Sequence, residues 1–303
     1  MSTAVATARR SRRRRLLGRN PIGWLFVTPY SLFLALVFAF PVGFALYMSV
    51  HDYYFVAPGA EADRPFVGLD NYVEAVTDPV VQRAFFNVLV FLVINVPLTV
   101  AGALVLATAL NMALPLRTWF RAAYYVPYVT ASVAVIGVWL WLFNQDGLVN
   151  NVLGSAQPEP SWLVNSFWTM PLIAVYVTWK QIGFFVLIYL AALQNVPKEL
   201  HEAAALDGAG TVQRFRNVTV PGVRPATFLV VVLSFITGAQ LFTEPYLLTG
   251  GGGPAGASST PVLILYQQGI TQSRAGYAAA IGVILAVIVI VLSVLNRRRL
   301  EGD

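Results

Sequence analysis

Six long apolar blocks constrain the fold of this 303-residue chain more than any other feature of its sequence. A helix needs roughly 20 mostly apolar residues to cross the hydrocarbon core of a bilayer. Every block reaches that length; the blocks run from about Ile22 to Val50, Phe86 to Met112, Phe120 to Phe143, Trp168 to Gln194, Ala226 to Thr249 and Gly276 to Leu295. The chain is therefore predicted to be an all-α integral membrane protein with six transmembrane helices.

Strands are a poor alternative for these blocks. A strand of a membrane barrel needs only about 10 residues that alternate in polarity, whereas the blocks are longer and do not alternate. Open sheets would leave unpaired backbone groups in lipid. The composition agrees, because 57% of the residues are hydrophobic and only 11% are charged, where a soluble domain has about 25% charged residues.

Cysteine is absent, and only His51 and His201 supply imidazoles. Disulfides, thiolate metal sites and cysteine nucleophiles are thereby excluded. The two histidines are far apart in the sequence, so no metal site is predicted within the chain. An intramembrane enzyme would need paired aspartates or a Ser-His arrangement at matching depth, and Asp207 and His201 lie outside the spans instead.

Arginines gather before the first block, at Arg9, Arg10 and the run Arg12 to Arg15. The apolar block behind them is longer than the core of a signal peptide, which has about 7 to 15 residues. We interpret the segment as a retained signal anchor. A nucleic-acid-binding patch is disfavoured because the arginines adjoin a membrane span, so no nucleic-acid partner is expected.

The distribution of Lys and Arg predicts the orientation. With both termini in the cytoplasm, sixteen of the twenty basic residues lie on the inner side and only Arg64, Arg83 and Arg274 on the outer side, as the positive-inside rule requires. The predicted regions are a basic cytoplasmic arm (1–20), the first span with its outer loop (21–85), a transmembrane domain (86–296) with a cytoplasmic loop at about 195–224, and a cytoplasmic tail (297–303).

The cytoplasmic loop reads VPKELHEAAALDGAGTVQRFRNVTVPG and predicts two short helices. Pro197 suits a first helical turn, and Gly208 suits a left-handed stop. Thr211 would cap the second helix, which Pro221 would end. Residue types alone leave two interpretations open: a docking element that offers its carboxylates to a partner, or a solvated amphipathic loop.

A resemblance decides between them. The pattern Glu202-Ala203-Ala204, Asp207-Gly208-Ala209, Phe215, Val218 and Val220-Pro221 resembles the EAA loop of ABC importer permeases, specifically the carbohydrate-uptake group similar to maltose permeases. Isoleucine and leucine are commoner in that group at the places of Val218 and Val220. The stretches TWKQIGFFVLIYLAALQNVPKEL, PYLLTGGGGP and GYAAAIG are similar to other parts of the family, so the resemblance covers the chain from the first span to the last.

The resemblance implies a type I ABC importer fold in a prokaryotic plasma membrane. It implies that the EAA loop is a coupling helix seated in a cleft of a separate ATPase; the implied coupling residues are Glu202, Ala203, Ala204, Asp207, Gly208, Phe215 and Pro221. The implied partners are a second permease, a dimer of ATPase subunits, an extracytoplasmic solute-binding protein and a carbohydrate. The two lysines, Lys180 and Lys198, follow Trp179 and Pro197, so no P-loop motif exists. The chain is therefore expected to be no enzyme and to bind no cofactor, with ATP and Mg used by the ATPase.

Polar residues in the spans indicate a substrate path. Lys180 lies in the middle of the fourth block, and a charged lysine in lipid would cost at least about 2.5 kcal/mol, so it should face a wet cavity or a partner. Ser234, Thr237, Gly238 and Leu241 follow helical spacing on one face, with Gln240 beside it. A structural lysine and simple helix packing remain the alternatives for these two features.

Similarity to the maltose-type permease maps sugar contacts onto Lys180, Gln181, Phe184, Ser234, Thr237, Gly238 and Leu241. Gln240 and Glu244 are added as neighbours on the path. Pro245 is predicted to free a carbonyl and bend the fifth span, and the glycines at 250–253 predict a flexible outer loop. Glycerol-3-phosphate or another polyol is an alternative substrate because Lys180 could meet a phosphate. A proton-driven secondary transporter could use Lys180 and Glu244, but inverted repeats of broken helices are not evident.

Overall fold

The computed structural model describes residues 21–57, 59, 63–111 and 117–300, and within these ranges the chain is helical with no strand. The basic arm, the 297–299 side chains and the last three residues lie outside what is described. The main helices are α2 (Pro21–Leu34), η1 (Ala35–Ala39), α3 (Phe40–Ser49), α4 (Asp70–Thr77), α5 (Pro79–Asn111), α6 (Arg117–Val129), α7 (Ser132–Phe143), α8 (Leu148–Leu153), α9 (Thr169–Leu193), α10 (Lys198–Leu206), α11 (Thr211–Arg214), η4 (Phe215–Thr219), α12 (Val220–Gly222), α13 (Arg224–Ala239), α14 (Thr243–Leu248), α15 (Pro261–Tyr266), η6 (Gln267–Thr271) and α16 (Ala275–Leu300).

Five helical stretches of the described residues are long and apolar enough to cross a membrane: Gly23–Ser49, Pro79–Asn111, Ser132–Ala156, Thr169–Leu193 and Ala275–Val294. A sixth crossing is possible if the bent pair Thr211–Gly222 and Arg224–Ala239 counts as one span. The predicted all-helical, multi-span fold is confirmed. Two details differ: α5 begins at Pro79, before the expected start at Phe86, and the predicted outer loop contains the helix α4.

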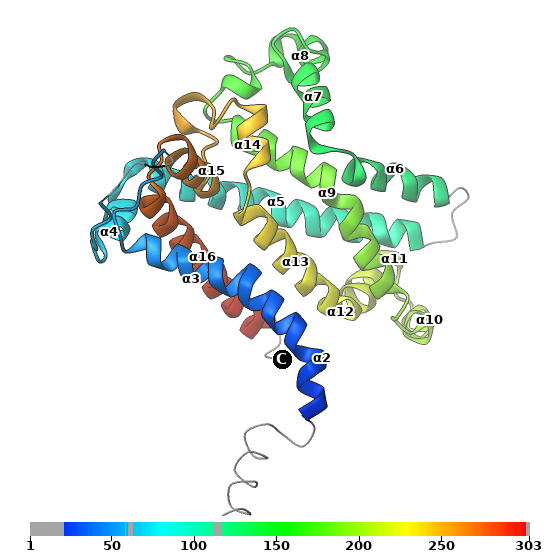
Figure 1. Ribbon diagram of the computed structural model, residues 1–303. Helices are drawn as coiled ribbons and strands as arrows, with labels where there is room; N and C mark the ends of the chain where they lie inside the picture. Colours follow the sequence, from blue (N-terminus) through cyan, green and yellow to red (C-terminus); the bar gives the residue numbers. More distant parts are fainter. Residues whose placement is uncertain (1–20, 58, 60–62, 112–116, 301–303) are drawn as a thin grey trace, which may run out of the picture.

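Helices α5 and α9 pack along each other at the centre of the molecule (Figure 1). Their contact includes a buried hydrogen bond in which the Asn95 amide donates to the Thr178 hydroxyl at 2.8 Å. At Gly183, α9 approaches α6 so closely that an added Cβ would lie 2.1 Å from the Tyr124 carbonyl oxygen. Because Gly183 has no Cβ, the backbones of α6 and α9 can come into direct contact here.

The predicted continuous third span, Phe120 to Phe143, is wrong. The chain leaves the helix at Ala131, whose φ of −55° and ψ of 127° are extended, and α7 starts afresh at Ser132. Figure 1 shows α7 turning steeply away from α6. Thr130 and Ser132 flank the break, but single Thr and Ser residues also occur inside unbroken spans, so they did not reveal it.

The predicted continuous fifth span is also broken, between α13 and α14. Pro245 has no N–H to donate to the Leu241 carbonyl one turn earlier, and the Thr260 hydroxyl donates to that carbonyl instead, at 2.6 Å. The Thr260 oxygen also accepts from the Leu263 amide and so caps α15. The expectation that Pro245 frees a carbonyl therefore holds, and a buried threonine satisfies it.

The glycine run after α14 is not the flexible loop expected. All four glycines have positive φ, between 65° and 120°. The Gly252 carbonyl accepts from the Ser258 amide at 2.8 Å, and the Gly251 carbonyl accepts from the Gln267 side chain at 3.1 Å. An added Cβ at Gly252 would lie 2.5 Å from the Ser259 hydroxyl oxygen. The run is therefore a folded, partly buried turn that needs glycine.

Candidate functional site: the coupling loop and the mid-membrane polar cluster

The cytoplasmic loop forms the two short helices that the sequence predicts. Helix α10 ends at Leu206, and Gly208 adopts a φ of +80°. The Gly208 amide donates to the Ala205 carbonyl at 3.0 Å, and the Ala209 amide to the Ala204 carbonyl at 2.9 Å. These two bonds form a Schellman motif, which satisfies the last carbonyls of a helix by means of a left-handed residue. The predicted stop at Gly208 is confirmed.

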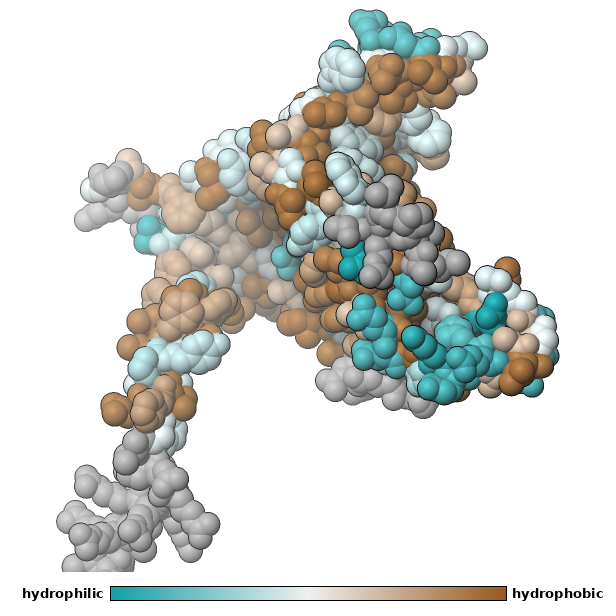
Figure 2. Space-filling view, turned by 90° about the vertical axis from the view of Figure 1, so that its right-hand side faces the viewer, coloured by the Kyte–Doolittle hydropathy of each residue, from teal (hydrophilic) through white to brown (hydrophobic). Residues whose placement is uncertain are grey.

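Helix α10 projects from the bundle, and none of its residues is buried (Figure 1). Leu206 is 90% exposed and Val212, at the start of α11, is 79% exposed. The carboxylates of Glu202 and Asp207 are also exposed. Figure 2 shows hydrophilic atoms beside apolar ones at the height of α10, a mixed surface of the kind that protein interfaces use.

The structure divides the predicted coupling residues into two groups. Glu202, Ala203, Asp207, Gly208 and Pro221 are exposed to any partner. Ala204 is half-buried, and Phe215 packs against the core formed by α5, α9 and α13. Phe215 thus anchors the loop to the membrane helices and is poorly placed to contact a separate protein.

Two capping predictions for the second helix are wrong. Gly210 occupies the N-cap position, with its amide bonded to the Gln213 side chain at 2.9 Å, and Thr211 is the first helical residue. Pro221 lies inside α12, which continues to Gly222. A bend of 70° then separates this helix from α13. The loop therefore joins the fifth span through a sharp elbow.

Lys180 lies in the middle of α9, and its ammonium donates to the Ser132 hydroxyl at 2.5 Å. Ser132 is the first residue of α7, so the lysine lies against the break in the third span. Glu244 lies in the first turn of α14, directly after the break in the fifth span. The structure thus places Lys180 at the break in the third span and Glu244 at the break in the fifth.

Phe184 lies one turn beyond Lys180 and stacks on Tyr128 of α6, with ring centroids 5.2 Å apart and planes inclined by 16°. Gln181 is half-buried beside them. Aromatic faces next to an ammonium and hydroxyls suit a polyol, which offers hydroxyls for hydrogen bonds and apolar ring faces for stacking. These positions are compatible with the predicted substrate path.

The residues of the predicted polar face of the fifth span do not share one surface in the structure. Ser234 and Gly238 are buried, and an added Cβ at Gly238 would lie 2.7 Å from Leu92 of α5. Leu241 lies beyond the end of α13, and Thr237 donates to the Leu233 carbonyl of its own helix at 2.9 Å. The packing interpretation therefore accounts for Gly238. Thr237 and Gln240 remain exposed on the described surface.

Sequence reasoning missed several residues that shape this region. Ser132 and Thr260 pair with Lys180 and with the Leu241 carbonyl across long sequence separations, and nothing local indicates those partners. Gly183 lies within the stretch TWKQIGFFVLIYLAALQNVPKEL, and nothing in that stretch indicates that the α6 backbone packs against this glycine. No cluster of three or more His, Asp or Glu side chains capable of holding a metal ion occurs in the described part of the chain.

Comparisons with known proteins agree with this architecture. Residues 83–298 match the family described as "Binding-protein-dependent transport system inner membrane component". The chain is 34% identical to the lactose transport system permease protein LacF of Rhizobium radiobacter, over 96% of this chain and 97% of that protein. It is 32% identical to the sn-glycerol-3-phosphate transport system permease protein UgpA of Yersinia pestis, over 92% and 93% of the two chains.

The fold resembles that of a bacterial ABC transporter involved in the import of the acidic polysaccharide alginate. The TM-score is 0.77 at 21% identity, over 96% of this chain and 99% of the other. The predicted resemblance to ABC importer permeases is confirmed, and with it the prediction that this subunit is a transporter component and not an enzyme. The chain belongs to the family of inner membrane components of binding-protein-dependent transport systems.

Proposed function

We propose that the chain is one of two transmembrane subunits of an ATP-driven importer for a sugar or oligosaccharide. The observation that supports the coupling half of this proposal is the projecting helix α10, none of whose residues is buried. Glu202 and Leu206 on this helix, and Asp207 directly after it, are exposed. Such a surface supports docking of a cytoplasmic ATPase dimer, which would supply the nucleotide site and the Mg²⁺. Both termini would then lie in the cytoplasm.

The elbow after Gly222 gives a physical route for coupling. A displacement of α10 and α11 reaches the membrane through α12 and α13, because Phe215 fixes the loop to the α5–α9–α13 core. The path then continues to the break before Glu244. ATP-driven closure of the ATPase would thereby open and close the polar cluster around Lys180 to the two sides of the membrane.

The purified chain is expected to hydrolyse no ATP, because its sequence offers no P-loop. Hydrolysis should appear when the cognate ATPase subunits are added and should rise further with the loaded solute-binding protein. The measurement is phosphate release from the chain alone and from the reconstituted complex. Robust hydrolysis by the chain free of any copurified subunit would contradict the proposed division of labour.

Lys180→Ala is expected to raise the KM for transport while the ATPase subunits still copurify. An ammonium that binds substrate hydroxyls contributes about 1.5–3 kcal/mol per bond, so a change of roughly tenfold or more is expected. Ser132→Ala is the matched control, since it removes the same hydrogen bond and keeps the charge. Equal effects of the two variants on KM, or none, would make Lys180 a structural residue.

The substrate class is tested with a panel of sugars and sugar phosphates. Lys180 also suits a phosphate, and the relative named for sn-glycerol-3-phosphate transport keeps that alternative open. We expect neutral sugars delivered by the binding protein to stimulate ATP hydrolysis by the complete transporter. Stimulation by glycerol-3-phosphate alone would favour the alternative, and uptake abolished by an uncoupler but not by loss of the ATPase would favour an ion-coupled transporter.

A further inference from the structure

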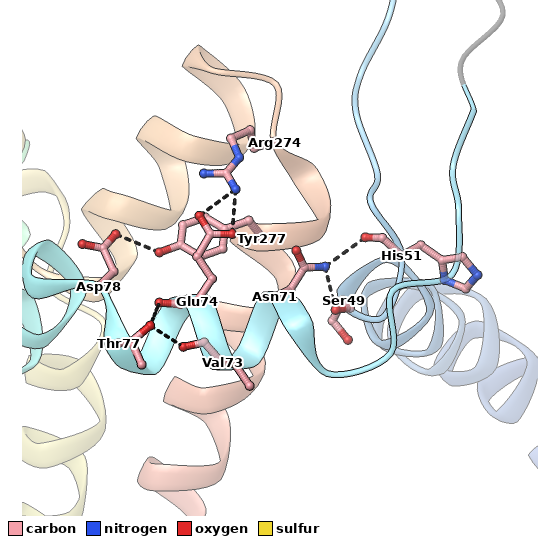
Figure 3. A network of polar contacts seen from close by, with 9 residues as sticks. All are labelled: Ser49, His51, Asn71, Val73, Glu74, Thr77, Asp78, Arg274 and Tyr277. Atoms are coloured by element: carbon pink, nitrogen blue, oxygen red, sulfur yellow. Dashed lines mark hydrogen bonds and ion pairs between the residues drawn. The ribbon is translucent and has the colours of Figure 1, made fainter.

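Helix α4 is tied at both ends to the points where membrane spans end (Figure 3). At its start, the Asn71 amide donates to the carbonyls of Ser49 and His51, each at 3.0 Å. In its middle, Glu74 accepts two bonds of 2.8 Å from Arg274, and at its other end Asp78 accepts from the Tyr277 hydroxyl at 2.9 Å.

These contacts fix the depth of α4. The first apolar span ends at Ser49, and the last apolar span begins at Ala275. A helix bonded to both points lies where the spans leave the hydrocarbon, at the level of the lipid headgroups. Figure 3 shows α4 running across the start of α16, so the helix lies roughly in the plane of the bilayer.

The two faces of α4 differ in character. Leu69, Val73 and Val76 follow the spacing i, i+4 and i+7, which places them on one face, and they are 67%, 60% and 59% exposed. The opposite face buries Asn71 and Ala75 against the bundle. In Figure 3, Val73 points to the side toward which α16 continues, away from Arg274. The apolar stripe, Leu69, Val73 and Val76, therefore faces the membrane.

We propose that α4 is an interfacial helix whose apolar stripe inserts into the boundary between headgroups and acyl chains, in the leaflet opposite the coupling helix α10. An amphipathic helix held at that depth buries its apolar face in lipid and leaves its polar face to water or protein. Glu74 is paired with Arg274, and Asp78 accepts a hydrogen bond from Tyr277. Insertion of the stripe therefore leaves neither of these two carboxylates without a partner.

The experiment uses the absence of native cysteine. Val73→Cys and Val76→Cys are labelled with an environment-sensitive fluorophore in the complete transporter, reconstituted in phosphatidylcholine vesicles. Asp70→Cys, on the polar side of the same helix and also exposed, is the matched control. We expect a blue shift and strong quenching by lipids with a shallow nitroxide at positions 73 and 76. Iodide in the buffer should quench the label at position 70 most.

Two results would overturn the proposal. Equal iodide quenching at positions 70 and 73 would place the stripe in water. Protection of the 73 and 76 labels from both iodide and nitroxide lipids would mean that a protein subunit covers the stripe. Repeating the measurement with and without the solute-binding protein identifies which subunit that is, and normal assembly of all three variants is checked by gel filtration.

Discussion

Gly208→Asp is expected to abolish transport while the permease remains folded and inserted. The residue has a φ of +80°, and an added Cβ would meet no atom of this chain within 4 Å. A left-handed aspartate costs about 1–2 kcal/mol, too little to unfold a membrane bundle. The new carboxylate would instead stand beside Asp207 on the surface proposed to enter the ATPase. Uptake in proteoliposomes and copurification of the ATPase measure the effect.

Gly210→Asp is the matched control for that variant. It adds the same charge two residues away, but Gly210 has a φ of −68° and lies at an N-cap, where aspartate is favoured. It is expected to keep most of the transport activity. Normal transport by Gly208→Asp would remove the coupling role of the turn, and equal loss in both variants would point to added charge and not to the position of Gly208.

Gly183→Ala is expected to prevent correct packing of α6 on α9. The added methyl group would lie 2.1 Å from the Tyr124 carbonyl oxygen and 3.0 Å from the Tyr125 Cα, both backbone atoms. No side-chain rotation relieves such a clash, so the helices must separate. Overpacking of this kind costs about 1–3 kcal/mol or more. We expect a large loss of monodisperse protein in detergent and a lowered thermal unfolding midpoint.

Gly102→Ala controls for the loss of a glycine in the same region. Its added Cβ would meet only the terminal methyl of Ile182, at 2.9 Å, and that flexible side chain can move. The variant should therefore be recovered in nearly normal amounts. Similar stability of Gly102→Ala and Gly183→Ala would show that the close approach of α6 and α9 tolerates a methyl group.

Local chemistry explains why the cytoplasmic loop could be predicted in detail. An alanine-rich run closed by a glycine specifies a helix and its stop with residues a few positions apart, and Gly208 adopts the expected left-handed conformation. The N-cap of α11 was less predictable, because both Gly210 and Thr211 could occupy that position. Gly210 occupies it, and its amide donates to the Gln213 side chain.

Hydropathy did not place the breaks in the spans, because isolated residues such as Thr130 and Ser132, which flank the first break, also occur inside unbroken helices, as Thr178 does in α9. Pro245 predicted a freed carbonyl, that of Leu241. The hydroxyl that donates to this carbonyl belongs to Thr260, which is 19 residues away and caps another helix. Helix α4 is only eight residues long, and its depth depends on Arg274, two hundred residues from Glu74. Contacts across such separations are set by tertiary packing, which no local pattern encodes.

The bond between Thr260 and Leu241 also bears on how the fifth span moves. A kink whose freed carbonyl already has a donor can persist through every stage of a cycle, because straightening is not needed to satisfy the backbone. The two halves, α13 and α14, can therefore change their angle about the short link Gln240–Phe242, where the Leu241 amide bonds to the Gly238 carbonyl at 3.2 Å, without opening the turns of either helix. Under the proposed coupling, movement of the cytoplasmic loop would tilt α13 while α14 stays bonded to the folded glycine turn.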